Sequence, residues 1–442
     1  MPETSEGRIV GKTEGLGGTA ARAGRHSPFR VVVAGGGVAA LEATLALRAL
    51  AAELVDVEVV APEHHFWYRP LAVAEPFEQG RAQAFELAEL TGSVGARFTP
   101  GGLARVDADA RVATTTTGAE IAYDALVVAS GAHPRAALAG ALTFRGPADA
   151  EAFRLLLAEL ETGAVARLVF AVPGGVTWPL PLYELALMTA AHIRRRETPP
   201  VALALVTHES APLAIFGEAA SAAVSSLLAE RDVFTFCGRY VVRAGEGEVS
   251  VVPTGSIPAD RVVALPRLGG TEIEGLPTDA EGFVPTDHHG RVVGLERVWA
   301  AGDVTTFPVK QGGIAAQQAD AVAQSIAAEA GADLRPDAFR PVLRGLLLTG
   351  GVPAYLRAEL GGGHGDTSLA ASDALWWPPG KLVGRYLAPF LAERQNVPTL
   401  VPDPPPGALS VETDLSADGF GAAVGEGPSS RKARSARVPS GC

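Results

Sequence analysis

The feature that most constrains the fold of this chain is an apolar run that ends in three consecutive glycines and continues into an alanine-rich segment. Residues 31–34 suit a buried strand and residues 38–51 a helix, so the glycines lie at a strand-to-helix turn. Gly35 permits a sharp turn, Gly37 removes a side chain where a ligand would approach the backbone, and Ala40 keeps helix and strand close. The amides at such a helix start bind phosphate well. The spacing therefore predicts a turn that holds the diphosphate of a dinucleotide.

A second predicted strand supports this interpretation of the turn. Residues 55–61 form an apolar run that ends just before Glu63. In dinucleotide-binding folds, an acidic residue about 20 residues beyond the glycines binds the ribose, and Glu63 stands near that position. The alternative is an ordinary strand-to-helix turn, because the glycine pattern alone is a weak signal. The strand and the acid together favour the dinucleotide site.

Composition limits the class of protein. The chain has 442 residues, of which 47% are hydrophobic, and a formal net charge of −12, which predicts a large core divided over two or three domains. We expect no nucleic-acid partner, because phosphate binding needs a basic surface. No apolar run is long enough to cross a bilayer and the first 29 residues hold no hydrophobic signal core, so we expect a cytoplasmic protein.

The order of the predicted elements indicates an α/β fold with two Rossmann-like domains, the first of them discontinuous, and a small C-terminal region. Strands and helices alternate from residue 31 to a buried strand before Ser130, and the alternation starts again at residues 167–172. The chain then returns to the first unit with a strand before Gly302 and a helix over 313–329. The two units are interpreted as duplicated nucleotide-binding folds.

The ends of the chain differ from this body. The ordered part ends with two segments. One is a predicted hairpin over 344–357 that turns at Gly350-Gly351, and the other is an aromatic segment that starts at Trp376. Residues 1–28 and 403–442 are rich in Gly, Pro, Ser, Ala and charge without periodicity, and we predict that both are disordered tails. The aromatic segment suits either a plug between units or a contact with a membrane surface.

Four segments, taken together, carry a family resemblance. They are the glycine turn at 35–40, Ala129-Ser-Gly-Ala132, Ala301-Gly-Asp303 and Lys310-Gln-Gly-Gly-Ile-Ala-Ala-Gln-Gln318. In this order they resemble the two-dinucleotide-domain flavoproteins of the pyridine nucleotide-disulfide oxidoreductase superfamily, in the branch of sulfide:quinone oxidoreductase and type II NADH dehydrogenase. The resemblance implies an FAD-binding domain over 29–145 and 285–335, an NAD(P)-type second domain over 146–284 and a C-terminal interface region over 336–402.

The resemblance also implies which residues bind FAD. The candidates are Gly35, Gly37, Ala40, Glu63, Arg69, Gly131, Gly302, Asp303, Gly313 and Ile314. Gly131 would let backbone pass close to the cofactor, and Asp303 would accept hydrogen bonds from the ribitol chain. For Asp303 the alternative is a plain N-cap of a helix. No metal site is expected, because the adjacent histidines of the chain lack ligand spacing.

Two side chains are candidates for catalysis. Flavin chemistry needs a group that stabilises negative charge on the reduced ring, and a helix start can do so. The amides of Gly313 and Ile314 are candidates for that role, helped by Lys310. Glu184 lies in a Tyr-Glu-Leu-Ala run that resembles one in NADH dehydrogenases, and it is a candidate proton carrier. The alternative for Glu184 is a solvent-facing helix residue.

The chain departs from its relatives at two points. The cysteine pair of sulfide oxidation is absent, because Cys237 lies in the wrong unit and Cys442 in the tail. The second unit does not repeat the glycine fingerprint, because no register after its first strand puts glycine at both of the first two key positions with a small residue at the third. Trp178 and Pro179 also add bulk near the place of a pyrophosphate, although Glu209 still stands at the position of a ribose-binding acid.

These observations predict an FAD-dependent oxidoreductase that passes electrons through flavin to a quinone or similar acceptor. Its small-molecule donor is not identified, and a cysteine-based sulfide mechanism is not expected. One alternative is an NAD(P)H dehydrogenase with an atypical dinucleotide site, and another is a non-catalytic flavin-binding or redox-sensing module. A peripheral membrane contact and a homodimer stay open.

Overall fold

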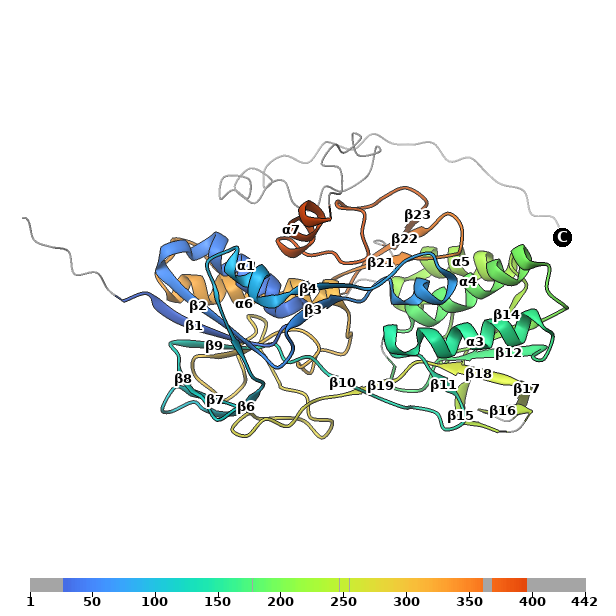
Figure 1. The fold of residues 1–442 in the computed structure, drawn as a ribbon, viewed down its shortest axis with the longest axis horizontal. Coiled ribbons are helices and arrows are strands. Elements are labelled where there is room, and N and C mark those ends of the chain that lie inside the picture. Colours follow the sequence, from blue (N-terminus) through green and yellow to red (C-terminus); the bar gives the residue numbers. More distant parts are fainter. Residues whose placement is uncertain (1–26, 177, 246, 254, 361–367, 396–442) are drawn as a thin grey trace, which may run out of the picture.

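A computed structural model describes residues 27–395, apart from residues 177, 246, 254 and 361–367. Two domains lie side by side along the long axis, and each is built around a five-stranded parallel sheet (Figure 1). The predicted α/β fold with two Rossmann-like domains is therefore confirmed. The tails predicted over 1–28 and 403–442 fall outside the described residues, except for residues 27 and 28.

The first sheet joins four strands from the start of the chain to one from much later. Its order is β20 (Val298–Ala300), β9 (Ala125–Val128), β1 (Phe29–Ala34), β2 (Val55–Ala61) and β5 (Arg97–Pro100). Val31 and Val33 of β1 pack beneath α1 (Val38–Ala51) and α6 (Gly312–Glu329), which meet through small alanine faces. Because β20 and α6 complete this domain, it is discontinuous in sequence.

The other face of the first sheet is also covered. Val32 and Ala34 pack in a second core with residues of a small antiparallel sheet. That sheet consists of β6 (Leu103–Asp107), β7 (Val112–Thr115) and β8 (Glu120–Ala122). Since both faces are buried, β1 is apolar along its whole inner part, as parallel strands usually are.

The second domain repeats this architecture with its own elements. Its sheet has the order β11 (Leu142–Thr143), β18 (Arg261–Ala264), β12 (Arg167–Ala171), β13 (Ala202–Val206) and β14 (Val233–Phe236). One face packs under α3 (Ala150–Glu161), α4 (Leu180–Arg196) and α5 (Glu218–Ala229). The other packs on β15 (Tyr240–Ala244), β16 (Glu248–Val252) and β17 (Ser256–Pro258) (Figure 1).

The chain crosses between the domains earlier than the sequence pattern indicated. We expected the second domain to begin at residue 146 and to end at 284. In the structure, β11 already pairs with β18 in the second sheet, and Ile273 and Val284 lie in the core of the first domain. The antiparallel ribbon of β10 (His133–Arg135) and β19 (Arg267–Gly269) carries the two crossings. Such short or irregular segments have no periodicity that would mark them.

Smaller elements complete the molecule around the two sheets. The predicted hairpin is formed by β21 (Val342–Leu347) and β22 (Ala354–Glu359), and β23 (Leu369–Ala371) adds to it. The helix α7 (Leu387–Arg394) lies over the α1 side of the first domain (Figure 1). A ribbon of β3 (His65–Tyr68) and β4 (Gln83–Glu86), followed by α2 (Leu87–Gly92), lies at the edge of that domain.

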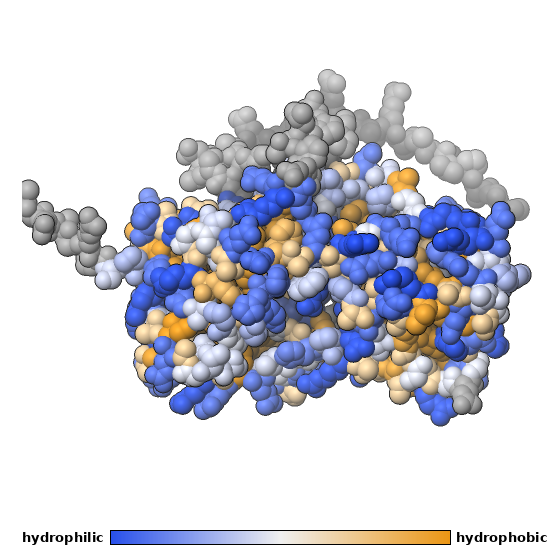
Figure 2. Space-filling view, viewed as in Figure 1, coloured by the Kyte–Doolittle hydropathy of each residue, from blue (hydrophilic) through white to orange (hydrophobic). Residues whose placement is uncertain are grey.

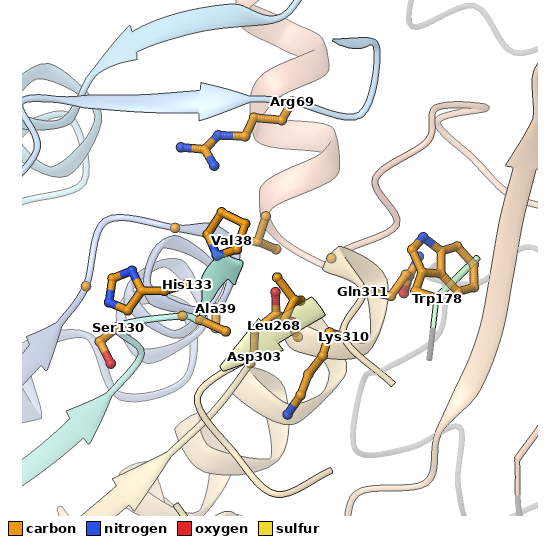
Figure 3. A pocket seen from close by; sticks show the side chains of 18 of the residues that line it. Val38, Ala39, Arg69, Ser130, His133, Trp178, Leu268, Asp303, Lys310 and Gln311 are labelled. Atoms are coloured by element: carbon orange, nitrogen blue, oxygen red, sulfur yellow. The ribbon is translucent and has the colours of Figure 1, made fainter. Parts of the chain in front are cut away.

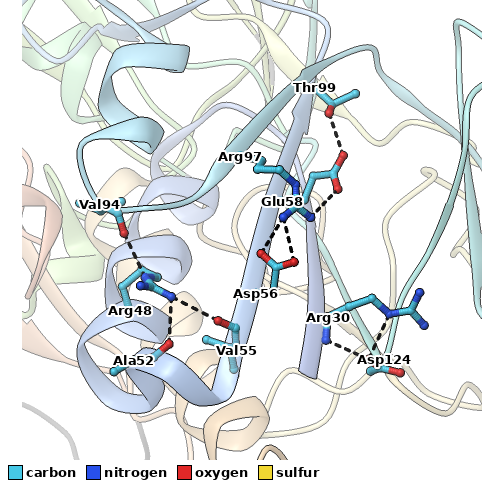
Figure 4. A network of polar contacts seen from close by, with 10 residues as sticks. All are labelled: Arg30, Arg48, Ala52, Val55, Asp56, Glu58, Val94, Arg97, Thr99 and Asp124. Carbon is cyan, nitrogen blue, oxygen red and sulfur yellow. Dashed lines mark hydrogen bonds and ion pairs between the residues drawn. The ribbon is translucent and has the colours of Figure 1, made fainter. Parts of the chain in front are cut away.

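The surface is mostly hydrophilic on the face seen in Figure 2, with apolar residues scattered between charged ones. At the edge of the first sheet, Arg97 of β5 donates to both carboxylate oxygens of Asp56 and to Glu58 on β2 (Figure 4). These pairs are partly exposed to solvent and so contribute little to stability. Within the described residues, no helix is both long enough and apolar enough to cross a bilayer.

Candidate functional site

A large cavity lies where the first domain, the second domain and the C-terminal region meet. Its volume is about 1300 Å³. Ser130 and His133 stand on one side and Trp178 on the other, with Asp303 and Lys310 between them (Figure 3). Pockets for a single drug-sized ligand are roughly 300–1,000 Å³, so this cavity has room for a dinucleotide and a second small molecule.

The glycine turn forms one end of the cavity. Gly35 has a φ of +145°, and a Cβ atom there would lie 2.1 Å from the carbonyl oxygen of Ala129, so only glycine fits. Gly37 differs, because a Cβ atom there would meet nothing within 4 Å. Gly37 is the residue before α1, and it lines the cavity. The turn is therefore closed against the neighbouring strand at Gly35 and open to a ligand at Gly37.

The other residues predicted around the turn have different positions. Ala40 is fully buried between α1 and the sheet and does not line the cavity. Glu63 and Arg69 both line it. The Arg69 side chain extends from the end of β3 toward the cavity above Val38 (Figure 3). Arg69 is exposed and thus available to an anionic ligand.

Gly131, Gly302 and Asp303 line the middle of the cavity. Gly131 and Gly302 have φ angles of +74° and +84°, which disfavour other residues. The amide of Gly302 donates to Gln318 Oε1 at 2.7 Å, which fixes this turn on α6. Asp303 is not a helix cap, since Gln311 occupies that position of α6. Burial raises the pKa of Asp303, and the charge of Lys310 opposes that rise.

Lys310 lies below this turn and faces several acidic groups. Its Nζ donates to the carbonyl of Thr305 and stands 3.8 Å from the ring centre of Phe283. Burial lowers the pKa of Lys310 to about 8, and Asp303 is the largest opposing influence. Lys310 therefore gives up its proton more readily than an ordinary lysine, and its charge is linked to that of Asp303.

The start of α6 differs from the expectation. The amide of Ile314 donates to Gln311 Oε1 at 2.8 Å, so it is already bonded within the protein. Neither Ile314 nor Gly313 lines the cavity, and a Cβ atom at Gly313 would lie 3.3 Å from the carbonyl oxygen of Val383. Gly312 does line the cavity. At the start of α6, Gly312 is therefore open to a ligand, whereas Gly313 and Ile314, the two residues expected from the sequence, are not.

Glu184 is fully buried in α4 and forms an ion pair that the sequence did not indicate. Lys381 Nζ lies 2.7 and 2.6 Å from its two carboxylate oxygens, and the amide of Leu348 donates to Oε1 at 2.8 Å. The solvent-facing alternative for Glu184 is therefore wrong, since its side chain is 0% exposed. Burial raises the pKa of Glu184, and the positive charge of Lys381 opposes that rise. Both residues line the cavity.

In the second domain, the position of a ribose-binding acid is already engaged. Glu209 Oε2 accepts hydrogen bonds from Tyr183 at 2.8 Å and from Thr207 at 2.9 Å. The Tyr183 hydroxyl thus points toward Glu209, and Tyr183 does not line the cavity. Cys237 does not line the cavity either. The described residues hold no group of three or more His, Cys, Asp or Glu side chains placed to bind a metal.

The arrangement fits an FAD molecule extended across the first domain. Gly37 and Gly131 leave open space where the backbone meets the cavity, and Glu63 and Arg69 supply a carboxylate and a cation at its rim. Asp303 and Lys310 follow along the same wall. The Glu184–Lys381 pair, from α4 and the C-terminal region, lines the same cavity.

Comparisons with known proteins agree with this geometry. The family described as pyridine nucleotide-disulphide oxidoreductase matches residues 29–325. A NADH dehydrogenase-like protein of Mycobacterium tuberculosis is 28% identical over 301 residues, which cover 62% of this chain and 72% of the relative.

Solved structures share the fold. The sulfide:quinone oxidoreductase of Aquifex aeolicus has a TM-score of 0.70 at 21% sequence identity. The matched region covers 78% of this chain and 86% of the chain of that enzyme. A ferredoxin reductase of Rhodopseudomonas palustris has a TM-score of 0.54 at 18% identity, with 74% and 81% covered. The family match spans more than half of the chain, and the cavity fits the cofactor. The chain therefore belongs to the pyridine nucleotide-disulphide oxidoreductase family and is an FAD-dependent oxidoreductase.

Proposed function

We propose that this protein reduces a quinone, with the Glu184–Lys381 pair as the proton source. Reduction of a quinone to a quinol consumes two electrons and two protons. FAD, when bound, supplies the two-electron chemistry of its isoalloxazine ring. The single observation that carries the proposal is a buried carboxylate with an ammonium group 2.6 Å away, both lining the same cavity as Asp303.

The cavity has apolar side chains that suit a flat ring. Trp178, Leu180 and Leu346 line it, and Trp178 packs on Phe216 with 5.7 Å between ring centres. Apolar walls with a few placed polar groups are the usual composition of a small-molecule site. The Lys381 ammonium can donate one proton to a quinone oxygen, while the two electrons and the second proton would come from the reduced flavin. Glu184, whose pKa is raised by burial, can then return a proton to Lys381.

The test separates the acceptor step from the unidentified donor. The FAD-loaded protein is reduced under argon by light with EDTA as the electron donor, mixed with menadione, and followed by the return of flavin absorbance. We expect Lys381→Met and Glu184→Gln each to slow the return by about 10²-fold, the effect of losing a general acid. Arg385→Met is the matched control, because Arg385 lies in the same segment over the Tyr386 ring and outside the cavity. An unchanged rate in either cavity variant would exclude the proposed role.

A nicotinamide donor is the second candidate, favoured by the NADH dehydrogenase-like relative. The bond between Tyr183 and Glu209 argues against it, because a ribose would have to displace that hydroxyl. Bleaching of the flavin by NADH or NADPH under argon would support this candidate. Bleaching by neither, together with failure of the light-reduced protein to react with quinones, would instead support a non-catalytic flavin-binding module.

A further inference from the structure

Within the described residues two charged residues are fully buried, and both hold the same stretch of chain. They are Glu42 and Glu184, each 0% exposed. We call residues 376–394 the C-terminal strap. Glu184 of the second domain pairs with Lys381 of the strap, and Glu42 of the first domain binds the strap five residues further on. The strap is thus held by one buried carboxylate from each domain.

Glu42 binds the strap at the start of α7. Its Oε1 accepts the amide of Tyr386 at 2.8 Å, and its Oε2 accepts the amide of Leu387 at 2.8 Å. These amides belong to a helix start, where backbone donors lack partners within the helix and the dipole favours a negative charge. The side chain of Asp320 of α6 also lies against Glu42, and a hydrogen bond between the two carboxyl groups requires that one of them carries a proton. A Cβ atom at Gly384 would lie 2.6 Å from Glu42 Oε2, so the strap passes directly against this carboxylate.

Other contacts leave Lys381 little freedom between its two anchors. The indole of Trp376 donates to the carbonyl of Gly380 at 2.9 Å, just before Lys381. After it, Leu382 and Leu387 are buried in the apolar cluster between the strap and α1. The Lys381 ammonium therefore reaches Glu184 from a backbone that is fixed on the first domain. A shift of α7 along α1 would be transmitted to the ion pair through five residues of strap.

We propose that Glu42 is a positioning residue, which holds the strap so that Lys381 meets Glu184 beside the flavin site. This inference rests on the proposed function. Displacement of a reacting group by about 1 Å can cost as much as 10²-fold in rate. Glu42→Gln places an NH₂ group against one of the two backbone amides, so the strap loses one of these hydrogen bonds. We expect this partial release to slow quinone reduction about tenfold.

The closing experiment is a double-mutant cycle on menadione reduction by the light-reduced, FAD-loaded protein. We expect Glu42→Gln to lower the limiting rate without changing the FAD content, and to have no further effect in the Lys381→Met background. Leu160→Ala is the control, because Leu160 is buried in α3, outside both the strap and the cavity. It should lower thermal stability and leave the rate within about twofold. Glu42→Asp, which keeps the charge but is one methylene shorter, serves if the amide variant does not fold.

A second readout needs no activity. Hydrogen exchange of residues 380–390 in FAD-free protein should be faster in Glu42→Gln and unchanged in Arg385→Met. The outcomes are separable. A normal rate in Lys381→Met would refute the proposed function and this inference with it. Two other outcomes would overturn the inference alone. In the first, Lys381→Met reduces menadione slowly but Glu42→Gln reduces it at the normal rate. In the second, both variants are slow and the double variant is slower by the product of the two effects.

Discussion

Replacing Glu42 with glutamine should change how the stability of this protein depends on pH. Burial raises the pKa of Glu42 from 4.5 to about 7. Between these values the folded protein holds a proton that the unfolded chain has released, so a rise in pH favours unfolding. Each pKa unit corresponds to about 1.4 kcal/mol, and the whole shift to about 3 kcal/mol. The wild type therefore loses about 3 kcal/mol of stability between about pH 4 and about pH 8 through this one group.

The variant lacks this titration but has its own cost. An amide cannot accept both backbone N–H groups, so Glu42→Gln should be less stable than the wild type at low pH by about 1–3 kcal/mol. That difference should shrink as the pH rises, because only the wild type is destabilised by ionisation. Urea unfolding of the two FAD-free proteins, followed by circular dichroism from about pH 4 to about pH 8, measures the difference at each pH. A difference that stays constant across this range would refute the reasoning.

Three further predictions concern packing and cofactor retention. Gly37→Glu should fold normally and stay colourless, because the new side chain has room in the cavity but fills the place of a phosphate. Gly35→Ala should instead lose thermal stability even without FAD. Flavin retained by Gly37→Glu would contradict the assignment of the glycine turn to the diphosphate. Ser368→Ala should lower the unfolding free energy by about 2 kcal/mol, since the buried hydroxyl bonds the carbonyl of Phe216 and one amide of α5; an unchanged melting temperature would contradict this. Gly345→Ala should cost about 1–3 kcal/mol in the same assay, because the new methyl would lie 2.6 Å from the Phe216 ring; equal stability would show that the ring moves freely.

Sequence reasoning was most successful where the signal is local. The strand before Gly35 and the helix after Gly37 follow from apolar periodicity and glycine spacing, and the structure has that helix over Val38–Ala51, as expected. The glycine turn and Asp303 come together in one cavity because parallel strands end at the same sheet edge. These features need only residues that are close in sequence or share a repeated pattern.

The missed features depend on contacts between distant segments. Lys381 pairs with Glu184 across 197 positions, and no spacing rule connects them. Glu42 offered a signal, since it is an acid on an alanine-rich helix, but its partners lie 344 and 345 positions away. The helix start at Ile314 was misjudged because the Gln311 side chain, three residues before, takes the amide that a ligand would need.

The late entry of β20 into the first sheet has a consequence for how the chain acquires its structure during synthesis. All strands of the second sheet lie between Leu142 and Ala264, whereas the first sheet waits for Val298–Ala300 and its cover α6. As a chain emerges from the ribosome in order, we expect the second domain to be complete first. Until α6 has been synthesised, the alanine face of α1 has no helix against it. The nascent first domain is therefore the part that most needs protection from aggregation.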